Sequence, residues 1–147
     1  MTENTITGYS GPMVCRLSGV TYRQLDYWAR TGLVTPSVTP ASGSGSKRAY
    51  SYSDVLEVKV IKSLLNSGVS LSRARQAVEC LRSSLGADLA ASSLVLSDAG
   101  SVLAANDGEL VDLLRGGQGV FNIVQLGNVV AELISELSKS EREAATA

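Results

Sequence analysis

The first part of the chain alternates short segments carrying an apolar stripe with breaks that contain glycine, a pattern typical of short helices. Residues 12–17 fit a helix that opens on proline and ends at Gly19. A second helix is predicted over residues 22–30, with Thr21 as its N-cap and Gly32 just beyond its end. Two short helices joined by a turn that contains glycine form a helix-turn-helix.

Residues 33–49 do not continue this pattern. Two prolines and the Gly/Ser run at 41–46 cannot hold a helix and offer little to bury. The run ends on the basic pair Lys47 and Arg48, and aromatic residues then alternate with small ones from Tyr50 onward. We predict two short strands around a flexible tip, which is a wing; the alternative is a plain interdomain linker.

Helical spacing returns after the predicted wing. Ser53 and Asp54 begin a helix that stops at residues 66–68, and Ser70 caps another whose apolar stripe reaches Leu85. Such stripes indicate a core or a contact with a partner helix.

The remaining third has a different order of elements. Residues 94–96 and 102–104 form a predicted hairpin, followed by a helix at 109–115, a strand at 120–126 and a helix from Asn128. This ββαβα order makes an α/β unit too small to be very stable alone, so we expect it to pair with a copy of itself. The apolar stripe from Val129 to Leu137 on the last helix is expected to form this contact, against its own copy or against the hairpin around Leu94–Leu96.

The predicted fold class is therefore α+β, with a winged helix-turn-helix followed by a small α/β unit. We divide the chain into a disordered tail at 1–11, a DNA-binding domain at 12–85, a dimerisation or sensing unit at 86–140 and a flexible tail at 141–147.

The net charge of the chain changes sign between the predicted DNA-binding domain and the unit that follows it. Residues 11–85 hold ten basic and four acidic side chains, a net charge of about +6. From residue 86 onward, three basic side chains face nine carboxylates, a net charge of about −6. The first part is suited to a polyanion, so the net charge of −1 for the whole chain does not argue against nucleic-acid binding.

Composition excludes several function classes. The chain has no histidine, and its two cysteines, Cys15 and Cys80, lack CxxC spacing, which removes most zinc sites and catalytic triads. Neither an enzyme nor a cofactor is indicated. No apolar run could span a bilayer and the first residues do not form a signal peptide, so we expect a cytoplasmic protein with no membrane partner.

The second helix carries the candidate DNA-binding residues. In a helix-turn-helix, the first residues of this helix reach base edges, and here they are Thr21, Tyr22 and Arg23, with Tyr27 close by. Arg23 can bind a guanine in bidentate fashion or clamp a phosphate. Trp28 lies opposite the exposed face and is assigned to the core.

Three motifs occur in order along this part of the chain: VTYRQLDYWARTGLVTP at 20–36, RAYSYSDV at 48–55 and GVSL at 68–71. They resemble the recognition helix and its exit, the wing-to-helix segment and the next helix start of the MerR family. The resemblance covers residues 15–85 and implies a winged helix-turn-helix. Carried over by position, it implies phosphate and base contacts at Tyr22, Arg23, Tyr27, Arg48 and Tyr50; Lys47 joins them through its place beside the tip.

The resemblance also implies a homodimer on pseudo-palindromic promoter sites. Many regulators of this family bend and underwind the spacer, so that RNA polymerase can use promoter elements that are out of register. Two features depart from the family: the wing is longer and richer in Gly and Ser, and Gly86 interrupts the long dimerisation helix. The C-terminal part resembles some actinobacterial MerR-type regulators. The family's metal sensors place cysteines after that helix, and the lack of any beyond Cys80 argues against metal or redox sensing.

The sequence thus predicts a homodimeric, sequence-specific transcription regulator whose partners are double-stranded DNA, a second copy and RNA polymerase. Two alternatives stay open. One is an architectural protein that binds DNA with little base preference. The other is a C-terminal sensor of a ligand or protein, with DNA binding as its output.

Overall fold

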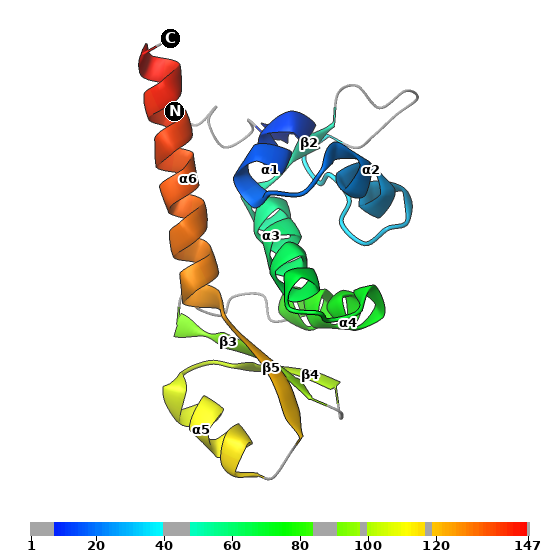
Figure 1. Ribbon diagram of the computed structural model, residues 1–147, viewed down its shortest axis with the longest axis vertical. Coiled ribbons are helices and arrows are strands. Elements are labelled where there is room, and N and C mark those ends of the chain that lie inside the picture. The colour runs from blue at the N-terminus through cyan, green and yellow to red at the C-terminus, as the bar shows by residue number, and fades with distance from the viewer. Residues whose placement is uncertain (1–7, 40–47, 84–90, 98–99, 117–118, 147) are drawn as a thin grey trace. The chain divides into compact units, whose positions relative to one another are not determined.

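The computed structural model describes residues 8–39, 48–83, 91–97, 100–116 and 119–146 (Figure 1). Its contacts divide the chain into two compact units, residues 1–62 and 63–147. Helices and small antiparallel sheets occur in both, and the α+β class predicted from the sequence is confirmed.

The first unit opens with two short helices that pack on each other, α1 (Gly11–Ser18) and α2 (Tyr22–Arg30). Gly19 ends α1 in the left-handed conformation, with φ at 87°. Thr21 begins α2 through a capping box: its hydroxyl accepts from the Gln24 N–H at 3.0 Å, and the Gln24 side chain accepts from the Thr21 N–H at 3.0 Å. Both predicted helices are confirmed, since local capping signals were sufficient to place them.

Strand pairing in this unit differs from the prediction. β2 (Ala49–Tyr50) pairs antiparallel with β1 (Tyr9–Ser10), which lies in the segment that we had expected to be a disordered tail. The segment before the wing adds a single bridge, between Thr39 and Ala49. The strand that supports the wing base therefore comes from the N-terminal side of α1. The predicted Gly/Ser tip at 41–46 lies outside the described residues.

Asp54 ties both ends of the wing to α3 (Tyr52–Asn66). Its Oδ2 accepts hydrogen bonds from the Ser37 N–H at 2.9 Å, the Ser37 hydroxyl at 2.6 Å and the Ser51 N–H at 2.9 Å. The Ser51 hydroxyl in turn accepts from the Asp54 N–H at 3.1 Å, which caps α3. Because Ser37 precedes the wing and Ser51 follows it, one buried carboxylate holds the two ends together.

The second unit contains α4 (Leu71–Arg82), a three-stranded sheet and two further helices, α5 (Asp107–Arg115) and α6 (Leu126–Thr146). The sheet has the order β4-β3-β5, with both outer strands antiparallel to the central one. The strands are β3 (Ser93–Ser97), β4 (Gly100–Ala104) and β5 (Val120–Gln125). The ββαβα order after α4 is as predicted from the sequence.

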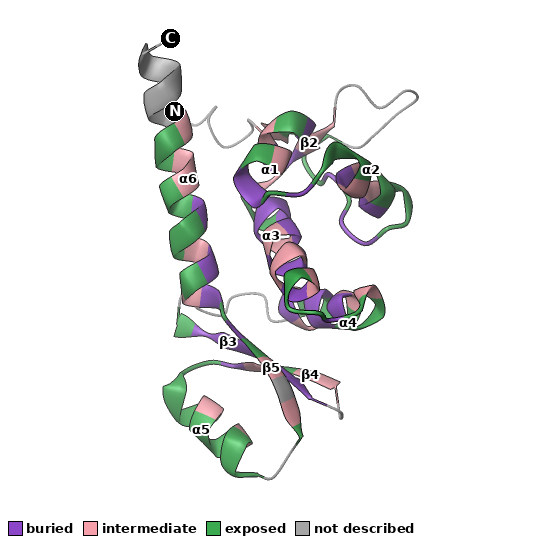
Figure 2. Cartoon of the chain, viewed as in Figure 1, coloured by how far each residue is buried: buried purple, intermediate pink, exposed green. Residues whose placement is uncertain are grey.

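β3 is buried along its whole length, whereas α5 has no buried residue (Figure 2). Successive residues of a strand point to opposite faces, so both faces of β3 are covered. α4, α5 and α6 all contact β3, and α4 packs mainly along β4. α4 therefore completes the core of the second unit. For this reason the two units divide at Lys62, before α4, whereas the predicted domain boundary lay after it, at residues 85 and 86.

The C-terminal end also differs from the prediction. We expected a flexible tail at 141–147, but α6 continues to Thr146. Along the described part of the chain, none of the helices combines the length and apolar character needed to cross a membrane.

Candidate nucleic-acid interface

α2 presents a polar and aromatic face to solvent over an apolar face that is buried. Tyr22 and Tyr27 are 51% and 50% exposed, and Arg23 is exposed between them. On the opposite side, Leu25 and Trp28 are buried in the core of the unit, as predicted for Trp28. A helix whose inner face is fixed can offer its outer side chains in a constant position.

Arg23 has no hydrogen bond or ion pair with any residue that the structure describes. Its five guanidinium N–H groups are therefore free for phosphate or guanine. Thr21 is exposed too, but its hydroxyl already serves the capping box, so its first role is to begin the helix.

The ring of Tyr22 lies against the start of α1. A methyl group added at Gly11 would come within 3.1 Å of Tyr22 Cε1, so glycine at this position leaves room for the ring. The close approach fixes the inner edge of the ring while half of its surface stays exposed.

Asp26 links α2 to the base of the wing. One carboxylate oxygen lies 2.7 Å from Nη2 of Arg48, and the other accepts from Nε of Arg30 at 3.0 Å. The hydrogen bond from Arg48, followed by that from Arg30, holds the pKa of Asp26 below its ordinary value, against the opposing effect of partial burial. The carboxylate is therefore charged at neutral pH, and the pair weakens only as the pH falls through this lowered pKa.

Arg48 was expected to contact DNA directly, but the structure holds it beneath α2. Its side chain is only 9% exposed, and its Nε and Nη1 have no hydrogen-bond partner in the described part of the chain. In the free protein this guanidinium joins the wing base to the recognition helix.

Tyr50 was also expected to contact DNA, but in the free protein this side chain is buried. The side chain has no exposed surface, because β2 turns it into the core of the unit. Its hydroxyl has no partner among the described residues, and burial raises its pKa above the ordinary value. We therefore assign Tyr50 to the core. Lys47, the remaining predicted contact, lies outside the described residues.

The structure thus leaves Thr21, Tyr22, Arg23 and Tyr27 all exposed, on α2 and at its N-cap, and we call these four residues the α2 face. No local signal indicated the ion pair between Asp26 and Arg48 in advance, because the two residues are far apart in the chain. Their opposite charges become informative only once β2 is placed beside α2.

Comparison with known families agrees with this geometry. The family model described as "MerR HTH family regulatory protein" matches residues 9–80. Residues 9–80 are a MerR-family helix-turn-helix domain. The MerR-family match begins at β1, the strand that the sequence pattern had not indicated.

Relatives of the MerR-type chain include proteins named uncharacterized HTH-type transcriptional regulators: Rv1830 of Mycobacterium tuberculosis strain H37Rv and Mb1861 of Mycobacterium bovis. Each is 51% identical over 123 residues, which is 83% of this chain and 54% of the relative. The chain therefore spans about half the length of these curated relatives, and the similarity extends well beyond the family match into the second unit.

Proposed function

We propose that this protein is a sequence-specific transcription regulator that binds promoter DNA as a homodimer, with the α2 face in the major groove. The observation that carries the proposal is the position of Arg23, exposed and without a partner among the described residues, on a helix whose opposite side is anchored by Trp28. The MerR-type domain and the names of the relatives support DNA binding as the output.

Arg23→Ala tests the α2 face. We expect the variant to lose about 1–3 kcal/mol of operator affinity, because a bidentate contact with guanine is removed. Binding to random DNA should fall much less. The measurement is fluorescence anisotropy at fixed salt, with the bound operator first identified by genome-wide mapping.

Lys139→Ala is the control, since it removes one exposed positive charge from α6 in the other unit, away from the α2 face. It should leave operator affinity unchanged. If Arg23→Ala instead weakens operator and random DNA equally, Arg23 binds a phosphate. If the unaltered protein hardly distinguishes the two DNAs, the architectural alternative is supported.

We propose that Arg48, at the base of the wing, positions α2 through its ion pair with Asp26. Lys47, next to the wing tip, is proposed to bind a phosphate through its charge. Asp26→Asn should weaken operator binding if its ion pair with Arg48 holds α2 against the wing. Simple electrostatics predicts the opposite sign, because removal of a carboxylate near phosphates favours binding.

Arg48→Ala should weaken operator binding to a similar extent, with little change in the log–log salt slope. Lys47→Ala should lower that slope by about 1 per chain, as expected for a lost phosphate contact.

Salt titrations of the three variants decide between these roles. If Asp26→Asn binds more tightly and Arg48→Ala lowers the slope by about 1 per chain, Arg48 is a direct phosphate ligand and not a positioning residue. Circular dichroism of each variant checks that α2 is retained.

We further propose that two copies on a pseudo-palindromic site distort the promoter spacer, to the benefit of RNA polymerase. Such a deformation costs a few kcal/mol and is offset by phosphate contacts from both wings. Hydroxyl-radical footprinting of the spacer would show whether it is bent.

The second unit is the proposed dimer contact. The sequence suggested an apolar stripe on α6 and the hairpin around Leu94, but Leu94, Val129 and Leu133 are already buried within the chain. Apolar side chains that stay exposed include Val111 and Leu114, three residues apart on α5. We name this pair the α5 face and take it as the surface that meets a second copy.

A further inference from the structure

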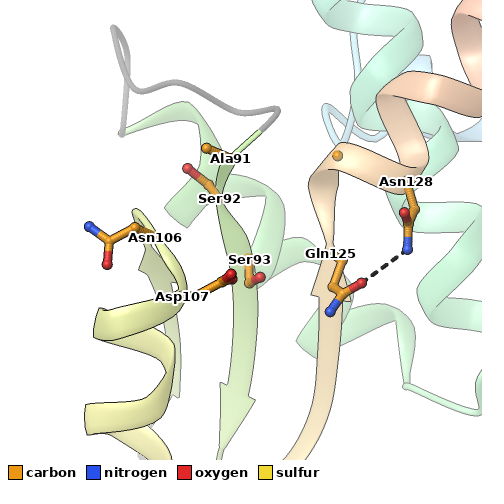
Figure 3. A pocket seen from close by; sticks show the side chains of 8 residues that line it. Ala91, Ser92, Ser93, Asn106, Asp107, Gln125 and Asn128 are labelled. Carbon is orange, nitrogen blue, oxygen red and sulfur yellow. Dashed lines mark hydrogen bonds between the residues drawn. The ribbon is translucent and has the colours of Figure 1, made fainter.

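A polar pocket of about 420 Å³ lies at one end of the sheet in the second unit (Figure 3). It forms where β3 starts, β5 ends, and α5 and α6 begin. Its volume is within the range of small-molecule sites. The pocket is lined by Ala91, Ser92, Ser93, Asn106, Asp107, Gln125, Gly127 and Asn128.

Ser93 places an unused hydroxyl at the wall of this pocket. The residue is only 7% exposed, and its hydroxyl has no hydrogen bond with any part of the chain that the structure describes. A hydroxyl at the wall of a pocket can both donate a hydrogen bond to a bound ligand and accept one from it.

Asp107 supplies the one charge among the lining residues. It is exposed and has no ion pair with a described residue. Figure 3 shows its carboxylate on the side of Ser93, whereas Asn106 points away and caps α5 through the Glu109 N–H at 2.9 Å. With no lysine or arginine in the lining, this side of the pocket favours an ammonium group.

The opposite wall is the first turn of α6. The first N–H groups of a helix have no acceptor within it, and the Leu126 N–H finds the Ser92 carbonyl at 3.0 Å. Gly127 and Asn128 follow in the same turn and line the pocket. Asn128 Nδ2 donates to Gln125 Oε1 at 3.1 Å, which leaves the Gln125 amide N–H groups available. N–H groups at a helix start favour a carboxylate.

We propose that this pocket binds a small zwitterion that carries an ammonium and a carboxylate on a short carbon frame, as in free α-amino acids. The ammonium pairs with Asp107 and the Ser93 hydroxyl, and the carboxylate accepts from the first turn of α6 and the Gln125 amide. A doubly charged anion is disfavoured by Asp107, and a simple amine leaves the helix N–H groups unused.

The test is isothermal titration calorimetry on the full chain without DNA, supported by thermal shift, with each proteinogenic α-amino acid as the probe. At least one should bind at concentrations up to about 10 mM. Asp107→Asn and Ser93→Ala should each weaken that binding about tenfold, because each removes a hydrogen bond to a charged group. Ethanolamine and lactate, which carry one charged group each, should bind about tenfold more weakly than the amino acid.

Asp112→Asn is the matched control: it makes the same change of charge on an exposed position of α5 outside this pocket, and should leave binding unaltered. The proposal is overturned if no amino acid binds, if Asp107→Asn binds as well as the unaltered chain, or if either single-charge compound binds equally well. Because no DNA is present, none of these outcomes depends on the proposed regulatory function.

Discussion

Replacement of Asp54 by alanine is expected to lower the free energy of unfolding of the first unit by about 3 kcal/mol. The buried carboxylate accepts three hydrogen bonds from Ser37 and Ser51, and its loss leaves two backbone N–H groups in a part-buried region without an acceptor. A carboxylate in the first turn of α3 also interacts favourably with the helix dipole. A loss of this size is a large part of the stability of a small domain.

Urea unfolding followed by tryptophan fluorescence measures this effect in the correct unit. Trp28 is the only tryptophan in the chain and is buried in the first unit, so its signal reports the unfolding of that unit. Ser53→Ala is the control, because Ser53 is exposed beside Asp54, and it should change the free energy by less than about 0.5 kcal/mol. Equal midpoints for the two variants would show that the carboxylate does not hold the wing ends.

Local signals in the sequence were sufficient for most of the helices. Capping residues such as Thr21 and Ser70 act within one turn, so they mark helix starts whatever the rest of the chain does. The α2 face could be predicted for the same reason: Arg23 and Tyr27 follow from the amphipathic pattern of a single helix.

Long-range pairings could not be predicted in this way. β1 has two residues and no alternating pattern, and it exists only because β2 pairs with it. Tyr50 and Arg48 were assigned to the DNA contact from their position in the motif. The pairing of β2 buries Tyr50 instead, and Arg48, just before β2, pairs with Asp26. The side-chain direction in a two-residue strand depends on the strand that it pairs with, and local sequence patterns do not identify that strand.

The packing of α4 determines how the proposed dimer can be tested. Truncation after Leu85 would remove the sheet, although Ala74, Ala77 and Val78 of α4 are buried and this helix packs along β4. The shortened chain would expose these side chains to water and associate or unfold for reasons unrelated to the dimer. Point substitutions on an exposed surface avoid this difficulty.

We expect the double variant Val111→Asp, Leu114→Asp to sediment as a monomer and to lose operator affinity by about 10²- to 10⁴-fold. Both side chains are exposed on α5, so the substitutions leave the core intact, while two carboxylates on an isologous contact meet their own copies across the two-fold axis. Once the dimer is lost, binding of the second half-site is no longer intramolecular, and the DNA-binding unit of each chain binds its half-site independently. Affinity for a single half-site should stay the same, because α2 belongs to the other unit.

Ile134→Asp separates this surface from the stripe that the sequence suggested. Ile134 is the most exposed of the large apolar side chains described on α6, and its substitution should leave the protein a dimer with full operator affinity. Sedimentation velocity at several protein concentrations, with anisotropy on full and half operators, gives both readouts from the same samples. If Ile134→Asp yields the monomer and the α5 variant remains a dimer, the contact lies on α6, because only the surface that a second copy covers is sensitive to a buried charge.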